Sequence, residues 1–162
     1  MKPRILVTSA RGALRYVMRH FVEPGADFAE KNDKYAAISI QDTFCGGYGF
    51  ELKKNKYCKD VLTLYFDDIE EPGHGLRLMT DVQALAICRF IKEHESDVDT
   101  LLIHCFAGVS RSRAVGAFAR EVLGLQPMDK SGCNEYVYDM LCIAWEKLTP
   151  KKREGGYLLK GQ

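Results

Sequence analysis

The most informative stretch of the chain reads Ile103-His104-Cys105-Phe106-Ala107-Gly108-Val109-Ser110-Arg111-Ser112-Arg113-Ala114. The residues at 100–104 are almost uniformly apolar, which is typical of a strand covered on both faces of a sheet. A helix is predicted from Arg111 to Leu123, because Gly124 supplies a stop signal. The five residues between Cys105 and Arg111 must therefore turn sharply, and Gly108 provides the backbone freedom for that turn.

This predicted loop has the features of an anion-binding site. Backbone N–H groups of a tight strand-to-helix turn converge, and the positive end of the helix points into the same space. Arg111 adds a planar guanidinium that can hold two phosphate oxygens at once. The predicted phosphate-binding residues are Phe106, Ala107, Gly108, Val109, Ser110 and Arg111.

Cys105 is the predicted nucleophile of this site. A helix N-terminus and a guanidinium favour the thiolate form of a neighbouring cysteine, which is the reactive form. The implied reaction is attack on phosphorus to give a cysteinyl-phosphate, followed by hydrolysis. An inert core cysteine at a strand end is the other interpretation. That interpretation leaves Gly108 and Arg111 unexplained at these spacings.

The segment from His104 to Ser112 resembles the His-Cys-x5-Arg-Ser/Thr signature of the protein tyrosine and dual-specificity phosphatases. The predicted elements agree with that family over roughly residues 34–148. The resemblance implies that Cys105 is the nucleophile and that Arg111 holds the phosphate. It also implies that Ser112 stabilises the departing thiolate, and that His104 and Asn134 support the loop. A helix cap is the alternative role for Asn134.

The reaction also needs an acid that protonates the departing oxygen, and a carboxylic acid is the usual donor. Phe66-Asp67-Asp68-Ile69 follows a predicted strand and resembles the loop that carries the aspartate of the family. We assign the role to Asp68 rather than Asp67, because some small members carry a Phe-Asp-Asp triplet whose second aspartate is the acid. Asp68 precedes Cys105 by 37 residues, more than is usual, so Glu70 and Glu71 remain candidates. The alternative for Asp68 is a solvated loop carboxylate.

The rest of the chain alternates predicted strands and helices. Strands are expected at 5–7, 35–40 and 61–66, and helices after Ser9, from Thr80 to near His94, and from about Gly132 to Lys147. Pro24-Gly25 ends the first helix. The alternation predicts a single α/β domain, residues 1–150, with a central, mostly parallel sheet flanked by helices, and a polar tail at 151–162.

Three local features refine this outline. Thr80 and Gln83 have the spacing of a capping box. Apolar residues recur at helical spacing in three helices: Leu14, Val17, Met18 and Phe21; Met79, Val82, Ala86 and Phe90; and Val137, Met140, Leu141, Ala144 and Leu148. The irregular stretch from Gln41 to Lys59 is interpreted as a solvated surface connection, with a loop bordering the active site as the alternative.

Composition restricts the class of partner. The 162 residues are 46% hydrophobic and 28% charged, which is typical of a folded, soluble protein. A net charge of +1 makes nucleic acid or membrane improbable as the main partner, although a local basic patch is compatible with it. The six cysteines include no Cys-x2-Cys pair, so no metal or cofactor is expected. The sequence has no signal-peptide core or membrane span, so we expect a cytoplasmic monomer with reduced cysteines.

The loop side chains also restrict the substrate. None of the residues from Phe106 to Ser110 is basic, whereas family members that act on inositol phospholipids usually place lysines there. We therefore expect a phosphorylated protein, with phosphotyrosine preferred and phosphoserine or phosphothreonine as further substrates. Two rival hypotheses are a pseudophosphatase that binds phosphoproteins without turnover and a sulfur-transfer enzyme of the rhodanese type.

Overall fold

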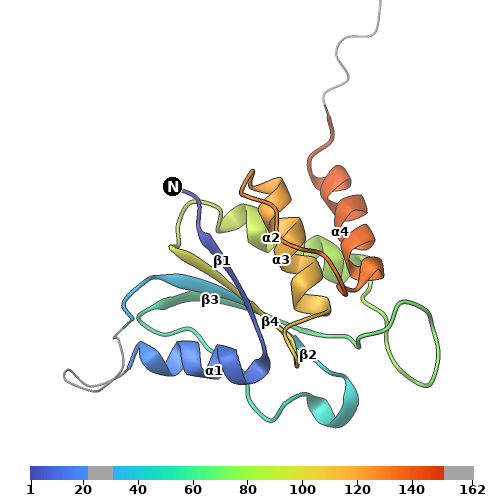
Figure 1. Cartoon of the computed structure of the whole chain (residues 1–162), viewed down its shortest axis with the longest axis horizontal. Coiled ribbons are helices and arrows are strands. Elements are labelled where there is room, and N and C mark those ends of the chain that lie inside the picture. The colour runs from blue at the N-terminus through green and yellow to red at the C-terminus, as the bar shows by residue number, and fades with distance from the viewer. Residues whose placement is uncertain (22–30, 152–162) are drawn as a thin grey trace, which may run out of the picture.

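The computed structural model describes residues 1–21 and 31–151, which form a four-stranded sheet flanked by helices (Figure 1). The strands are β1 (Arg4–Thr8), β2 (Tyr35–Gln41), β3 (Cys58–Tyr65) and β4 (Thr100–His104). The helices are α1 (Ala10–Arg19), α2 (Asp81–Glu93), α3 (Arg111–Val122) and α4 (Glu135–Leu148), with a short 3-10 helix at Phe44–Gly46. Every strand pairing is parallel, in the order β1-β4-β2-β3. The predicted α/β fold with a central, mostly parallel sheet is confirmed.

Helices cover the two faces of the sheet unequally. The larger core lies on one face, where α2 and α3 pack against the sheet and α4 packs on both of these helices (Figure 1). The smaller core lies on the other face, where Ala13 and Tyr16 of α1 pack with Tyr35 and Leu102 of the sheet. Leu52, from the connection between β2 and β3, completes it. Within the described residues, α1 is thus the α-helix that covers this second face.

Two helices begin at the caps that the sequence predicts. The Ser9 hydroxyl accepts a hydrogen bond from the Gly12 N–H at 3.0 Å and so caps α1. Thr80 and Gln83 form the predicted capping box at the start of α2, with the two reciprocal bonds at 3.0 and 3.1 Å. These bonds satisfy N–H groups that have no helical carbonyl partner.

The apolar stripe predicted for the first helix is not its buried face. Leu14, Met18 and Phe21 are 36%, 67% and 55% exposed, and of the four residues only Val17 packs against the core. The buried face contains Ala10, Ala13 and Tyr16 instead. The two alanines are small enough to let α1 lie close to the sheet. Three of the four stripe residues, Leu14, Met18 and Phe21, are therefore exposed.

The stripe predicted for the second helix is out of phase. Val82 is 73% exposed and Ala86 is only half-buried, although Met79 and Phe90 are buried. The buried face of α2 consists of Ala84, Ile87, Cys88, Phe90 and Ile91. This face is selected by contact with α4, which no local pattern specifies. The stripe predicted for α4 is correct: Val137, Leu141 and Ala144 are buried, and Met140 and Leu148 pack against them.

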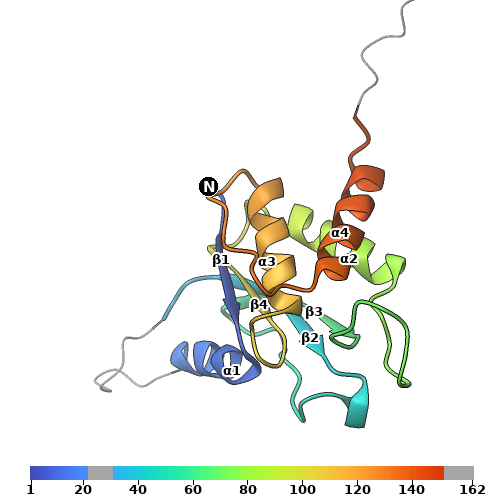
Figure 2. The same ribbon diagram turned by 45° about the vertical axis from the view of Figure 1, so that its right-hand side comes forward.

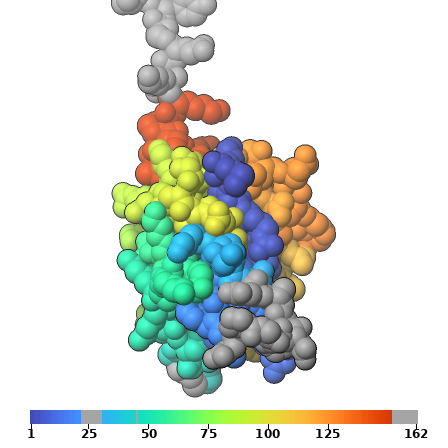
Figure 3. Space-filling model, turned by 90° about the vertical axis from the view of Figure 1, so that its left-hand side faces the viewer, coloured from blue at the N-terminus to red at the C-terminus, as the bar shows by residue number. Residues whose placement is uncertain are grey.

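The carboxyl ends of the four strands lie at one edge of the sheet. The loops that follow β2, β3 and β4 meet there, beside the start of α1 (Figure 2). The space-filling view in Figure 3 shows the opposite edge, where the segments that lead into β2, β3 and β4 lie side by side. Ligands of open α/β sheets bind at the carboxyl edge. The loops at that edge are therefore the place for a functional site.

Two predictions fall on residues that the structure does not describe. They concern the residues Pro24-Gly25 and all of the polar tail beyond Lys151. The prediction that the first helix continues to Pro24-Gly25 is wrong, because α1 ends at Arg19 with His20 as its C-cap. In the two described ranges, no helix combines the length and the apolar character that crossing a membrane requires.

Candidate active site

The loop between β4 and α3 turns at Gly108, as predicted. Gly108 has a φ of +77°, a conformation that side chains other than hydrogen disfavour. It also lies against the junction of β1 and α1, since a Cβ placed on it would be 2.5 Å from the Ser9 nitrogen. The Ala10 N–H donates to the Phe106 carbonyl at 3.0 Å in the same region. Glycine is therefore required twice, for the turn and for this close approach.

Cys105 follows β4 directly, and its sulfur lies inside the loop. The residue is 2% exposed, but it lines the pocket formed at the carboxyl edge. Its Sγ accepts a hydrogen bond from the Gly108 N–H at 3.3 Å and lies 3.1 Å from the Ser112 hydroxyl. Both groups can donate a hydrogen bond to this sulfur when it is a thiolate. Ser112 thus lies where the resemblance places it.

His104 connects the loop to the sheet. Its Nδ1 lies 3.0 Å from the Cys105 carbonyl, and its Nε2 lies 2.6 Å from the Ser39 hydroxyl. Burial is the main cause that lowers the pKa of His104, so the ring is neutral. Since a carbonyl only accepts, Nδ1 carries the proton and Nε2 accepts from Ser39. Gln41 donates to the same hydroxyl at 3.2 Å and completes the chain.

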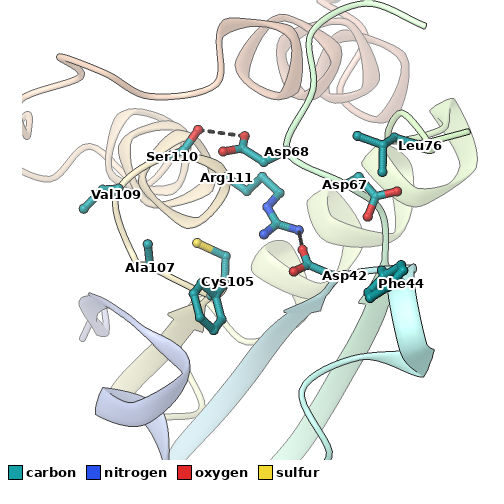
Figure 4. A pocket seen from close by; sticks show the side chains of 11 residues that line it. Asp42, Phe44, Asp67, Asp68, Leu76, Cys105, Ala107, Val109, Ser110 and Arg111 are labelled. Carbon is teal, nitrogen blue, oxygen red and sulfur yellow. Dashed lines mark hydrogen bonds and ion pairs between the residues drawn. The ribbon is translucent and has the colours of Figure 1, made fainter. Parts of the chain in front are cut away.

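Arg111 begins α3, and its guanidinium is buried beneath the loop. Nη1 donates to an Asp42 carboxylate oxygen at 2.6 Å and to the Phe66 carbonyl at 2.7 Å. Nη2 donates to the Tyr48 hydroxyl at 3.2 Å. Within the described residues Nε is buried and has no partner. Figure 4 shows the guanidinium beside Cys105, with the Asp42 ion pair on its far side.

The charge of Arg111 is secured by these neighbours. Burial on its own would lower the pKa of Arg111, but the facing Tyr48, Asp42 and Cys105 outweigh burial and raise it. The guanidinium is thus a permanent cation with two oriented nitrogens and one nitrogen that lacks an acceptor. This Nε is therefore a donor available to an oxygen of an anion.

The stretch from Gln41 to Lys59 borders this pocket, so its interpretation as a solvated surface connection is wrong. Asp42 and Phe44 line the pocket, and the Tyr48 ring lies 5.5 Å from the Phe106 ring, between centroids. The sequence missed all three residues, because no spacing relates them to the loop after β4. One signal was available: a segment that directly follows a buried parallel strand must start at the carboxyl edge.

Asp67 and Asp68 are adjacent in sequence and differ in environment. Asp67 is buried, and it accepts from the backbone N–H groups of Thr43 at 3.0 Å and Arg77 at 2.8 Å. Burial would raise the pKa of Asp67, but the hydrogen bonds from Thr43 and Arg77 lower it overall. Asp68 is exposed at the pocket rim, where the Ser110 hydroxyl donates to it at 2.8 Å (Figure 4). Asp67 therefore holds the loop, whereas Asp68 is exposed at the pocket rim.

Asn134 combines the two roles that the sequence left open. Its side-chain oxygen accepts from the Val137 N–H at 3.0 Å and caps α4, so this helix begins later than predicted. Its amide nitrogen donates to Asp68 at 2.9 Å and to the Ile69 carbonyl at 3.1 Å. Its backbone N–H donates to the Ser110 carbonyl at 3.3 Å. One buried residue thus joins the cap, the Asp68 loop and the Cys105 loop.

The two outside candidates for the acid lie elsewhere. Glu70 accepts from the Glu135 N–H at 2.7 Å and so occupies the start of α4. Glu70 and Glu71 line a neighbouring hollow rather than the pocket that contains Cys105. Of the three candidate acids, only Asp68 lines both, together with Ser110.

The pocket itself is small and has an apolar rim. Its volume is about 370 Å³. Charged groups occupy its floor, and four exposed apolar side chains surround its mouth: Phe44, Leu76, Phe106 and Val109. A phosphate on the floor and an aromatic ring between the rim residues match this distribution of polar and apolar surface.

One cluster in the described ranges has the composition of a metal site. Asp60, Glu93 and His94 bring their ligand atoms within 4.8 Å of one another. Both ring nitrogens of His94 already contact carboxylates, at 3.0 and 3.2 Å, and Asp60 pairs with Lys54. The cluster lies at the end of α2 and the start of β3, away from the pocket, and these contacts leave little ligand capacity for an ion.

Comparison with known proteins gives structural likenesses at low identity. No protein-family model matches the chain, and no curated protein matches it. Two solved structures do. One is Tk-PTP in its active form, at 18% identity and a TM-score of 0.42, covering 96% of this chain and 84% of that one. The other is OH1 from the Orf virus, described as a tyrosine phosphatase with triple substrate specificity, at 16% identity and a TM-score of 0.47, covering 86% and 82%. The chain is thus distantly similar to solved tyrosine phosphatases.

Proposed function

We propose that this protein hydrolyses phosphate monoesters through a cysteinyl-phosphate intermediate. One observation carries the proposal. The Cys105 sulfur faces hydrogen-bond donors, and beside it lies a buried guanidinium whose Nε has no partner among the described residues. A nucleophile and an unfilled phosphate-binding group therefore share one pocket, which is what covalent phosphoryl transfer requires.

Each residue of the site has a defined part in the first step. The Cys105 sulfur forms a bond to phosphorus while the bond from phosphorus to the leaving oxygen breaks. Arg111 and the backbone N–H groups of the loop hold the phosphoryl oxygens, which carry the developing charge. Asp68, oriented by Ser110 and Asn134, donates its proton to the leaving oxygen.

The second step regenerates the enzyme. Water attacks phosphorus, and Asp68, now ionised, takes a proton from that water. The bond between sulfur and phosphorus breaks, and the electron pair returns to Cys105. The Ser112 hydroxyl, 3.1 Å from the sulfur, donates to the thiolate as it leaves. The products are inorganic phosphate and the free thiolate.

The proposed substrate is a phosphorylated protein, with phosphotyrosine preferred. The rim residues Phe44, Leu76 and Phe106 offer apolar contact to an aromatic ring. The residues from Phe106 to Ser110 carry no cationic side chain that would bind the additional phosphates of an inositol phospholipid. Phosphoserine and phosphothreonine remain further substrates of the same site.

Cys105→Ser is the direct test. A serine hydroxyl is not ionised near neutral pH, so this variant should lose essentially all turnover of an aryl phosphate. It should retain binding of phosphate, because Arg111 and the loop backbone are unchanged. Near-normal hydrolysis by Cys105→Ser would exclude the covalent mechanism.

Two further measurements separate the rival hypotheses. A pseudophosphatase would bind phosphopeptides in its native form without releasing phosphate. A sulfur-transfer enzyme would turn over thiosulfate instead. A panel of phosphopeptides, phosphoinositides and RNA 5′ ends, assayed side by side, then identifies the substrate class.

A further inference from the structure

The outer face of α1 is left uncovered by the other described helices. The helix packs on the sheet through Ala10, Ala13 and Tyr16, and none of the other helices contacts its opposite side (Figure 1). That opposite side carries Leu14, Met18 and Phe21, all exposed. A contiguous exposed apolar stripe on a helix indicates an interaction surface rather than chance exposure.

A row of arginines borders this stripe. Arg11, Arg15 and Arg19 recur every fourth residue, and the helix has no acidic residue beside them. In the described ranges, none of the three arginines forms an ion pair. The outward surface of α1 therefore combines apolar side chains with arginines that form no ion pair to any described residue.

Lysines extend the cationic surface beyond the end of α1. The Phe21 ring lies 5.5 Å from the Tyr57 ring, between centroids. Lys34 and Lys56 both lie over the same Tyr57 ring, at 5.5 and 4.9 Å from its centroid. Cationic side chains therefore gather beside the end of α1 although the whole chain has a net charge of only +1.

These features favour one class of partner. A second copy of this chain would bring two arginine rows together, which like-charge repulsion opposes. An exposed helix that presents apolar side chains beside arginines has the composition of helices that lie in the interface of an anionic bilayer. We propose that α1 binds an anionic lipid surface through Leu14, Met18 and Phe21, with Arg11 and Arg15 contacting lipid phosphates.

The position of α1 connects this surface to the active site. Its first residue, Ala10, donates to the Phe106 carbonyl of the Cys105 loop. Phe106 and Val109, on the same loop, are 63% and 50% exposed. Binding through α1 would therefore bring the mouth of the pocket close to the membrane surface. The lipid-binding proposal does not depend on catalysis, because it concerns residues outside the pocket.

The test is co-sedimentation of the full chain with vesicles of phosphatidylcholine alone or mixed with phosphatidylserine. We expect binding to the mixed vesicles only, and weaker binding as salt rises, because salt screens the charges. The double variant Arg11→Gln, Arg15→Gln should weaken vesicle binding about 10- to 30-fold, because it removes two cationic contacts with the anionic membrane surface. Met18→Ser with Phe21→Ser should weaken it similarly, through lost apolar contact.

Matched controls lie on α2. Val82→Ser and Arg89→Gln change an exposed valine and an exposed arginine on the other side of the sheet, so they should leave vesicle binding unchanged. Thermal unfolding of every variant shows whether the fold is intact. Cys105→Ser should bind vesicles like the native chain, which separates this proposal from the proposed catalysis.

Three outcomes would overturn the proposal. The first is no binding of the native chain to mixed vesicles, or equal loss in the α2 controls. The second is binding to polyglutamate in solution without binding to vesicles, which would assign the α1 surface to an acidic polypeptide. The third is self-association that Met18→Ser abolishes, which would assign the surface to a second copy.

Discussion

The two loops that face each other across the pocket are held in different ways. The loop from Cys105 to Arg111 packs on the junction of β1 and α1, and its central glycine leaves no room for a Cβ. The loop from Asp67 to Met79 is mostly exposed, and contacts at its two ends hold it. The Asp67 carboxylate accepts hydrogen bonds from the backbone N–H groups of Thr43 and Arg77, and the neighbouring Asp68 carboxylate accepts one from Asn134.

The geometry of the Cys105 loop is determined by residues close in sequence, whereas the position of Asp68 is determined by contacts with residues far along the chain. Cys105, Gly108 and Arg111 lie within seven residues, and their geometry follows from one strand-to-helix turn. Asp68 reaches the same pocket through bonds to Ser110 and Asn134, which are 42 and 66 residues away. The nucleophile loop should therefore depend on its own backbone, and the acid loop on its partners. The following changes test that contrast.

Asp68→Asn should have the largest effect. An amide has no proton to donate to the leaving oxygen, so hydrolysis of a phosphotyrosine peptide should slow by roughly 10²–10⁴-fold. An activated aryl phosphate should lose less, because its leaving group departs as a stable anion. Steady-state kinetics on both substrates measures the difference.

Glu71→Gln is the matched control for Asp68→Asn. Glu71 is an exposed acid of the same loop that does not line the pocket, so its removal should leave both rates unchanged. If Glu71→Gln gave the substrate-dependent loss and Asp68→Asn did not, the acid would be misassigned.

Gly108→Ala should damage the nucleophile loop through its backbone. The added Cβ would meet the backbone of Thr8 and Ser9 within 2.5 Å and would disfavour the positive φ. We expect a loss of about 3 kcal/mol in the free energy of unfolding, from strain and overpacking together. Denaturant unfolding measures it.

Gly75→Ala separates the two contributions. Gly75 also has a positive φ, +69°, but its Cβ would meet nothing within 4 Å. This variant should lose only about 1 kcal/mol of the free energy of unfolding, the part that comes from the strained backbone conformation. Equal losses of unfolding free energy in the two variants would show that the close approach of Gly108 to β1 and α1 does not affect stability.

Asp42→Asn should weaken phosphate binding without unfolding the chain. The change removes the charge that orients Arg111, while Tyr48 and the Phe66 carbonyl still contact the guanidinium. We expect kcat/KM to fall about 10- to 100-fold, the usual scale for a displaced binding group, and vanadate inhibition to weaken.

Glu51→Gln is the comparison for Asp42→Asn. Glu51 accepts from the Tyr65 hydroxyl at 3.1 Å, in the same connection but outside the pocket, and its loss should leave vanadate inhibition unchanged. Unaltered vanadate inhibition in Asp42→Asn would contradict a positioning role for Asp42.

Asp67→Asn should alter stability and its dependence on pH. The pKa of Asp67 is lower in the folded chain than in the unfolded chain, so the carboxylate stabilises the fold above about pH 4. That contribution is lost as the pH falls through the folded-state pKa. The variant should be about 2 kcal/mol less stable near pH 7, from lost bonds to a charged acceptor, and the difference should shrink below pH 4.

Urea unfolding at several pH values measures this effect. Asp68→Asn provides the contrast, because Asp68 is exposed and its substitution should change stability little. A difference between native chain and Asp67→Asn that stayed constant from pH 7 to pH 3 would contradict the assigned role of Asp67.

The sequence alone determined the features that depend on neighbouring residues. The buried strand before Cys105, the turn at Gly108, the caps at Ser9 and Thr80, and the alternation of strands and helices are all local or periodic. Periodicity and capping act over a few residues, so one sequence suffices to recognise them. The α/β fold and the Cys105 loop followed from these signals.

Tertiary structure alone decided the features that depend on contact between distant segments. The ion pair of Asp42 with Arg111 joins residues on two separate loops, and no spacing along the chain indicates it. The buried faces of α1 and α2 differ from their apolar stripes, because the sheet and α4 select which side is covered. Asn134 serves as cap and loop support at once because the start of α4 lies against both pocket loops. Local sequence patterns indicate which residues can be buried or charged, but tertiary packing decides which of these residues contact one another.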